Sequence, residues 1–418
     1  MNTDYQDILA RNDKLKWVLP EIHWKAMQKI NETTCTALDE MHLSQMRENI
    51  RNGMWAKHGA MRNGLWGIGT NKAVIGIGAG GSLARNKDVL VGLFQMNLEK
   101  HLDDQPFMLA VCNHSFRPLL RDGVYPHFVC LIDASTAVMK QLNSNIPHRA
   151  RNTILLTGLH VNPGVIKEWD RQGRPIQFYV GASDRCLEVF KEETGEDGRP
   201  YACEEGGNVL NTVWLWAMKF LKSTVFMTVG NDLSYPLLPD LSKRRKAYYA
   251  DGDYSSNIGS KRDEAKYNFG CMGFDYEWNG IIDKWVVNLS PKGTAWQLWT
   301  YKRWLETQIT MHEHDKKSWH FFNCSESGIL GVVPKDDSTR ELMMERSNYV
   351  LLDEVLPKRW HTMRLEDAAI KFIAAREVLC QRNPKGILTG AGLVDVRPEQ
   401  MGIVRTTGHS SGLDVKHL

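Results

Sequence analysis

A glycine-rich turn between an apolar run and a helix pattern constrains this chain more than any other feature. Residues 73–83 read Ala-Val-Ile-Gly-Ile-Gly-Ala-Gly-Gly-Ser-Leu. The apolar run that ends at Ile77 predicts a strand, and the apolar spacing over 83–99 predicts a helix. Glycines let the backbone approach a ligand closely, and the N-terminus of a helix capped by Ser82 attracts anions. The expected phosphate ligands are Gly78, Gly80, Gly81 and Ser82.

The same turn fits the dinucleotide pattern Gly-x-Gly-x-x-Gly, with glycines at Gly76, Gly78 and Gly81. A nicotinamide-binding domain would carry an acidic residue at the end of the next strand, to hold a ribose. The next predicted strand, 107–111, is followed by Cys-Asn-His instead. Phosphate or nucleotide binding is therefore favoured over nicotinamide binding, and a purely structural tight turn is the other alternative.

The composition is that of a folded protein with a large core. The chain has 418 residues, 42% hydrophobic, and a net charge of +3, which does not require a nucleic-acid partner. Its eight cysteines are scattered without a Cys-x-x-Cys pair, which argues against a zinc site or a disulfide framework. The first residues do not resemble a secretory signal, and the most apolar window, 213–229, is too short to cross a bilayer. We expect a cytoplasmic protein with no membrane span.

Short β-branched runs alternate with helix patterns between residues 71 and 235. This alternation predicts an α/β fold with a doubly wound, mostly parallel, Rossmann-like sheet. The expected strands are 73–77, 107–111, 128–132, 153–157, 176–180 and 224–229. The expected helices are 83–99, 116–121, 165–171 and 209–221. Residues 1–70 form a helical lead-in, and residues 336–418 form a helical extension that ends in a loose tail from residue 406.

Polar residues that follow the predicted strands are the main site candidates, because ligands of parallel sheets bind beyond the carboxyl ends of the strands. Asn113 and His114 follow the second strand, Asp133 follows the third, and Asn231 and Asp232 follow the last. The two carboxylates suit Mg²⁺, a ribose hydroxyl or a general base, and helix N-caps are the structural alternative. The two asparagines and the histidine suit a nucleobase or a sugar, and the histidine is also a candidate base or a structural residue.

A long polar segment, 236–280, predicts a lid, a binding loop or a solvated insertion. Its basic run, Lys243 to Lys246, suits a leaving diphosphate or a polyanion such as DNA, and is equally common on solvated surfaces. Beyond it we expect a helix over 295–311 and a strand over 320–322. Ser325 and Glu326 then follow as candidate substrate contacts.

The order and spacing of these segments resemble the MptE-like family, which groups archaeal 6-hydroxymethyl-dihydropterin pyrophosphokinases with bacterial motility-associated-factor glycosyltransferases. The glycine turn resembles the family's strand followed by Gly-Ala-Gly-Pro-Ser-Leu. The segment 116–133 resembles its Pro-Leu-Leu-x-x-Gly-Ile-x-Pro-Asp segment with the Asp at the end of the next strand.

Further similar segments are 206–209 (Gly-Gly-Ser-Val in the family), 230–235 (Gly-Gln-Asp-Leu-Ala-Tyr), 250–252 (His-Ala-x-Gly), the helix 296–304 and 323–328 (Asn-x-Thr-Glu-Gly-Gly). The resemblance spans roughly residues 10–335. The chain departs from the family pattern at His127, Tyr249 and Asn208, where the family has Asp, His and Ser.

The resemblance implies that residues 71–335 form a nucleotide-binding transferase domain. It favours a glycosyltransferase that uses a CMP- or UDP-type nucleotide sugar, with Asp133, Asp232 and His114 as catalytic residues. Nucleotide contacts would come from the turn, Asn113 and Asn231, and substrate contacts from Asn208, Ser325 and Glu326. Mg²⁺ is an optional cofactor, held by the two aspartates. The acceptor is open between a glycan, a protein, a pterin and modified DNA. One alternative is a 6-hydroxymethyl-7,8-dihydropterin pyrophosphokinase that uses ATP and Mg²⁺, and the other is a non-catalytic nucleotide-binding module.

Overall fold

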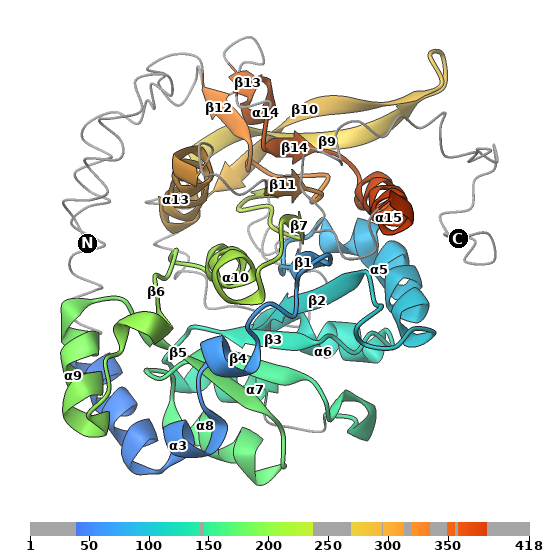
Figure 1. The fold of residues 1–418 in the computed structure, drawn as a ribbon. Coiled ribbons are helices and arrows are strands. Elements are labelled where there is room, and N and C mark those ends of the chain that lie inside the picture. Colours follow the sequence, from blue (N-terminus) through green and yellow to red (C-terminus); the bar gives the residue numbers. More distant parts are fainter. Residues whose placement is uncertain are drawn as a thin grey trace.

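A computed structural model describes residues 39–142, 146–236, 269–294, 296–312, 319–334, 349–355 and 358–382 (Figure 1). A nine-stranded sheet forms its centre, and every pairing within that sheet is parallel. In spatial order its strands are β14 (Trp360–Thr362), β11 (His320–Asn323), β7 (Val225–Val229), β1 (Ala73–Ile77), β2 (Phe107–Cys112), β3 (Phe128–Leu131), β4 (Ile154–Gly158), β5 (Ile176–Gly181) and β6 (Ala202–Cys203).

Helices cover both faces of this sheet, which confirms the predicted doubly wound α/β fold (Figure 1). Residues 39–51 are helical, and they confirm the described part of the predicted lead-in. The other α-helices are α3 (Met54–His58), α4 (Met61–Gly64), α5 (Leu83–Leu98), α6 (Asn113–Arg121), α7 (Met139–Leu142), α8 (Pro163–Arg171), α9 (Asp184–Thr194), α10 (Val209–Trp216), α13 (Trp296–Met311), α14 (Leu352–Val355) and α15 (Leu365–Arg382). Short 3-10 helices lie at Thr136–Val138, His148–Ala150 and Arg199–Tyr201, and a π-helical turn, Ala217–Leu221, extends α10.

Side chains of the central strands alternate between two hydrophobic cores. Ala73, Ile75 and Ile77 of β1 pack in the core that also contains residues of α5, α8 and α15. Val74 packs in the other core, with tryptophans of α10 and α13. Because both faces are covered, the strands read as nearly continuous apolar runs in the sequence. This pattern is the reason why six strands of the sheet could be predicted between residues 71 and 235.

The prediction of a loop over 236–280 is wrong for its last part. Strand β9 (Phe269–Asn279) pairs antiparallel with β10 (Lys284–Thr294), which also pairs with β8 (Tyr235–Pro236). Glycines and a proline interrupt the apolar alternation of this hairpin, so its strand signal is weak in the sequence. The basic run Lys243 to Lys246 and residue Tyr249 lie outside the described residues, as do 1–38 and the tail from residue 406.

The C-terminal part of the described chain completes the central sheet. Strand β14 pairs with β11, and α15 packs beside α5. The ring of Phe372, on α15, also lies 5.5 Å from that of Phe107, on β2, measured between centroids. A separate pair of strands, β12 (Val332–Pro334) and β13 (Tyr349–Leu351), lies above this edge. The residues predicted as an extension therefore contribute a strand to the same sheet as the glycine turn.

Two further observations concern cysteines and membrane helices. Five cysteines whose side chains the structure describes are buried and outside any disulfide: Cys112, Cys130, Cys186, Cys203 and Cys324. Among the helices that the structure describes, none combines the length and the apolar character that crossing a bilayer requires.

Candidate functional site

The central sheet reverses its strand order at β1. From β1 the chain runs outward through β2 to β6, and it then returns to place β7 on the other side of β1. In open parallel sheets, ligands bind in the crevice beyond the carboxyl ends of the strands at such a point. The glycine turn follows β1 here, and Gly230, Asn231 and Asp232 follow β7.

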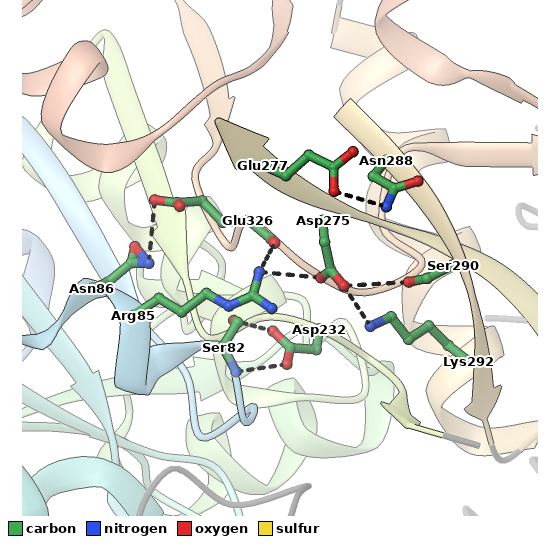
Figure 2. A network of polar contacts seen from close by, with 10 residues as sticks. All are labelled: Ser82, Arg85, Asn86, Asp232, Asp275, Glu277, Asn288, Ser290, Lys292 and Glu326. Carbon is green, nitrogen blue, oxygen red and sulfur yellow. Dashed lines mark hydrogen bonds and ion pairs between the residues drawn. The ribbon is translucent and has the colours of Figure 1, made fainter. Parts of the chain in front are cut away.

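The carboxylate of Asp232 lies at the N-terminus of α5 (Figure 2). The backbone N–H of Ser82 donates to its Oδ2 at 3.0 Å, and the Ser82 hydroxyl donates to its Oδ1. A Cβ atom on Gly80 would lie 2.6 Å from the carboxyl carbon of Asp232, so this position requires glycine. Burial raises the pKa of Asp232 to about 6, although the bonds from Ser82 and the charges of Lys292 and Arg85 act to lower it. This carboxylate therefore titrates close to neutral pH.

Most donors of the glycine turn are engaged within the protein. The N–H of Gly78 donates to the carbonyl oxygen of Val229 at 2.8 Å, and the N–H of Gly80 donates to that of Gly230 at 2.7 Å. Within the described residues, the N–H of Gly81 has no hydrogen-bond acceptor. Of the expected phosphate ligands, only Gly81 thus presents a free backbone donor. Phosphate binding by Gly78, Gly80 and Ser82 stays a prediction, and it would require a ligand to share or displace these bonds.

Charged side chains from outside the turn surround Asp232 (Figure 2). The ammonium of Lys292, on β10, lies 3.2 Å from Oδ2 of Asp275, on β9. Nη1 of Arg85 lies 3.2 Å from Oδ1 of the same carboxylate and donates to the carbonyl oxygen of Glu326 at 2.8 Å. Burial acts to raise the pKa of Asp275, but hydrogen bonds and the two cations hold it below its usual value. We call Ser82, Arg85, Asp232, Asp275, Lys292 and Glu326 the switch-point network.

Arg85 is the member of this network that can bind a ligand most directly. Its side chain is 46% exposed and lies in the first turn of α5, where the helix dipole also favours an anion. Its hydrogen bonds to other described residues all come from Nη1. The Nε and Nη2 donors of Arg85 therefore remain for an anion at this corner.

The loop after β11 brings two predicted substrate contacts to the switch point. The hydroxyl of Ser325 accepts the backbone N–H of Asn231 at 3.0 Å, and both residues are buried. The side-chain Nδ2 of Asn231 is buried without a described partner. Glu326 adopts a left-handed backbone with φ 57°, and burial raises its pKa. Its Oε1 lies 3.5 Å from Nδ2 of Asn86, a weak contact.

Three other predicted residues lie at the ends of β2 and β3. Asp133 is exposed, and its Oδ1 accepts the N–H of Ser135 at 2.7 Å, a local turn contact. The N-cap of the following 3-10 helix is Ser135, so Asp133 is not the helix cap considered as its structural alternative. Burial lowers the pKa of His114, while the nearby charge of Asp133 acts to raise it. Asn113 is buried, and its amide donates to Oε1 of Gln141. This second set therefore lies along the strand edge, away from Asp232.

Asp133 and Asp232 do not form a metal-binding pair. They follow β3 and β7, which are three strand positions apart in the sheet, or about 14 Å at the usual strand spacing. Mg²⁺ binds its oxygen ligands at about 2.1 Å, so one ion cannot contact both carboxylates. The part of the chain that the structure describes also contains no group of three His, Cys, Asp or Glu side chains that could hold a metal. Mg²⁺ binding by either aspartate on its own stays a prediction.

Asn208 caps α10. Its Oδ1 accepts the N–H of Asn211 at 2.9 Å, while its Nδ2 is buried without a described partner. The glycines before it allow close packing, since a Cβ on Gly207 would lie 2.5 Å from the ring of Tyr301. The residue thus has a clear structural function, and its amide donor is the group left for a substrate.

Sequence reasoning missed three members of the switch-point network. Arg85 lies in the first turn of a predicted helix whose N-terminus was expected to bind phosphate, and this position was a signal for an anion contact. Asp275 and Lys292 stood in a segment without a clear strand pattern. Only the pairing of β9 with β10 places them beside Asp232, so the sequence carried no signal for either.

Comparison with known proteins finds one family over the first two thirds of the described chain. Residues 44–237 match the sequence model described as 6-hydroxymethylpterin diphosphokinase MptE-like. This part of the chain, a little under half of its full length, is similar to the MptE-like family. The MptE-like range contains the glycine turn, Asp133 and Asp232, so the resemblance proposed from the sequence is confirmed there. A diphosphokinase transfers a diphosphoryl group, and the match therefore supports a transferase.

A solved structure, that of the Maf glycosyltransferase from Magnetospirillum magneticum AMB-1, is also similar. The two chains are 15% identical with a TM-score of 0.41, over 87% of this chain and 53% of that chain. The present chain thus spans about half the length of that protein. No curated protein matches the sequence.

Proposed function

We propose that this protein is a glycosyltransferase that moves a sugar from a nucleotide-sugar donor to an acceptor hydroxyl. The observation that carries this proposal is the carboxylate of Asp232, buried at the switch point with a pKa of about 6. A carboxylate that titrates near neutral pH can accept a proton from an attacking hydroxyl. The MptE-like match over residues 44–237 supports transfer from a nucleotide.

The donor phosphates bind at the N-terminus of α5 in this proposal, with Arg85 and the N–H of Gly81 as their contacts. The acceptor oxygen forms a bond to the anomeric carbon of the sugar, and the bond from that carbon to the phosphate oxygen breaks. The acceptor proton moves to Asp232, whose oxygens each keep one acceptor site beside the bonds from Ser82. The electron pair of the broken bond stays on the leaving phosphate, which Arg85 stabilises.

The polar residues along the strand edge suggest how the donor binds. A CMP- or UDP-type donor is proposed, with its nucleoside along the ends of β2 and β3 near Asn113, His114 and Asp133. Because all three are hydrogen-bonding groups, they suit a base or a sugar. A glycan, a protein, a pterin and modified DNA remain the acceptor classes to be tested.

A second candidate function is a 6-hydroxymethylpterin diphosphokinase, because the description of the matched family favours it. This reaction would use ATP with Mg²⁺ and would need a pterin slot. The described carboxylates do not form a metal site by themselves, so no step of this reaction is assigned to them. A non-catalytic nucleotide-binding module is the remaining alternative, and it predicts that Asp232→Asn leaves donor hydrolysis unchanged.

Thermal-shift measurements with CMP, UDP and ATP–Mg²⁺ separate these candidates. A glycosyltransferase predicts a rise in melting temperature with CMP or UDP and none with ATP–Mg²⁺. The reverse pattern would reject it in favour of the diphosphokinase. Arg85→Gln should abolish the rise. Arg151→Gln, at an exposed site between the 3-10 helix His148–Ala150 and β4, serves as the matched control and should keep it.

A further inference from the structure

Glu205 lies in the loop between β6 and α10, and two buried side chains hold one of its carboxylate oxygens. The hydroxyl of Tyr179, on β5, donates to Oε1 at 2.5 Å. Nε2 of His160, after β4, lies 3.2 Å from the same Oε1. Tyr179 is fully buried and the His160 side chain is 4% exposed. Neighbouring strands thus fix the position of this carboxylate.

The direction of these contacts follows from the chemistry of the partners. Burial and the charge of Glu205 raise the pKa of Tyr179 far above its usual value, so the tyrosine keeps its proton and donates it. Nε2 of His160 also lies 3.2 Å from the carbonyl oxygen of Ile132, so it faces two acceptors and carries the ring proton. Glu205 therefore accepts both contacts as a carboxylate.

The other oxygen of Glu205 remains for a ligand. Both contacts go to Oε1, and no described residue bonds to Oε2. The side chain is 28% exposed, although its partners are buried. This arrangement presents a fixed hydrogen-bond acceptor at the carboxyl edge of the sheet.

The surroundings of Glu205 indicate what this acceptor would bind. The buried amide donor of Asn208, which has no described partner, is three residues further along the same loop. A carboxylate acceptor and an amide donor together match neighbouring hydroxyls of a sugar ring, since each hydroxyl both donates and accepts. The strand after the glycine turn carries no acidic residue at its end, where dinucleotide-binding folds hold a ribose. Glu205 lies near the end of β4, about 14 Å along the edge from β1 at the usual strand spacing.

We propose that Glu205 binds a hydroxyl pair of a sugar ring in the nucleotide donor, with Tyr179 and His160 as its positioning residues. This inference rests on the proposed function, because it takes the bound molecule to be a nucleotide. The hydroxyl pair is the 2′- and 3′-hydroxyl of the ribose, because the transferred sugar must lie beside Asp232, at the end of β7, and Glu205 lies near the end of β4, four strand positions away. One of these hydroxyls donates to Oε2 of Glu205.

Isothermal titration with UMP, CMP and their 2′,3′-dideoxy forms tests this assignment. Glu205→Gln should weaken binding of the ribonucleotides roughly tenfold or more, the effect of a lost hydrogen bond to a charged group. Glu204→Gln, the exposed neighbour, is the matched control and should bind as the unmodified protein does. The dideoxy forms lack the hydroxyl pair, so they should bind the variant and the unmodified protein equally.

A second variant tests the positioning residue. Tyr179→Phe keeps the carboxylate but removes the hydroxyl that anchors it, so it should cause a smaller loss of affinity for UMP and CMP than Glu205→Gln does. Equal binding by Glu205→Gln and the unmodified protein throughout, or equal losses for ribose and dideoxy forms, would overturn the proposal. Failure of the unmodified protein to bind any nucleotide would instead reject the proposed function, and with it this inference.

Discussion

At the scale of single residues, the sequence identified the position of Asp232 but not its surroundings. Its place after a strand was enough to select it, because strand ends of parallel sheets converge. The serine that bonds to it was predicted to bind phosphate instead. That difference arises because Ser82 and Asp232 are 150 residues apart, and their contact depends on the pairing of β1 with β7.

Asp232 should lower the stability of the protein as the pH rises, the reverse of what a carboxylate with a lowered pKa does. Its pKa is about 6 in the folded state and near 3.8 in the unfolded chain, so the folded state binds more protons between these values. The stability that protonated Asp232 contributes is therefore fully present below pH 4 and is lost as the pH rises through 6. Two pKa units correspond to about 3 kcal/mol.

Asp232→Asn removes this titration. From pH 4 to pH 7, the free energy of unfolding of the variant should therefore gain about 2 kcal/mol relative to that of the unmodified protein, since part of the effect lies below pH 4. Urea denaturation of both proteins at pH 4, 5, 6 and 7 measures the difference. Parallel curves over this range would show that the carboxylate is not held with a raised pKa.

Asn208 offers a prediction that separates a cap from a substrate contact. Asn208→Ala should lower the free energy of unfolding by about 1 kcal/mol, because the N–H of Asn211 loses its acceptor. Asn208→Asp keeps this acceptor and should keep the stability, but it lacks the amide donor. Nucleotide binding measured by titration should then weaken in both variants. Full affinity in Asn208→Asp would limit the residue to capping.

At the scale of elements, strands buried on both faces were predicted well and the antiparallel hairpin was not. Strand β1 was predicted with its observed bounds, because its side chains fill two cores and leave no polar positions. The short β6 and the helix α9 were missed. The hairpin of β9 and β10 lacks such a continuous apolar run, so its register could not be read from the sequence.

The glycine turn gives a prediction at this scale. A Cβ on Gly78 would lie 2.3 Å from the carbonyl oxygen of Gly230, so the ends of β1 and β7 would have to separate. Gly78→Ala should therefore lower the free energy of unfolding by about 2 kcal/mol or more. Gly280→Ala is the control, because a Cβ there meets nothing within 4 Å. Chemical denaturation measures both, and a neutral Gly78→Ala would show that the two strand ends are not in close contact.

At the scale of the whole molecule, the switch-point network joins parts of the chain that no local pattern connects. It links the N-terminus of α5, the end of β7, the hairpin and the loop after β11 (Figure 2). The MptE-like match covers only the first two of these. The site is therefore complete only when the later strands are in place, and this is why the sequence did not place Asp275 and Lys292 in it.

A crystal structure of the protein grown with UDP or CMP tests the central claim most directly. The account predicts that the nucleotide phosphate lies at the N-terminus of α5, within hydrogen-bond distance of the guanidinium of Arg85 and the N–H of Gly81. A nucleotide bound elsewhere, with no phosphate at this helix terminus and with Arg85 contacting only Asp275 and Glu326, would contradict it.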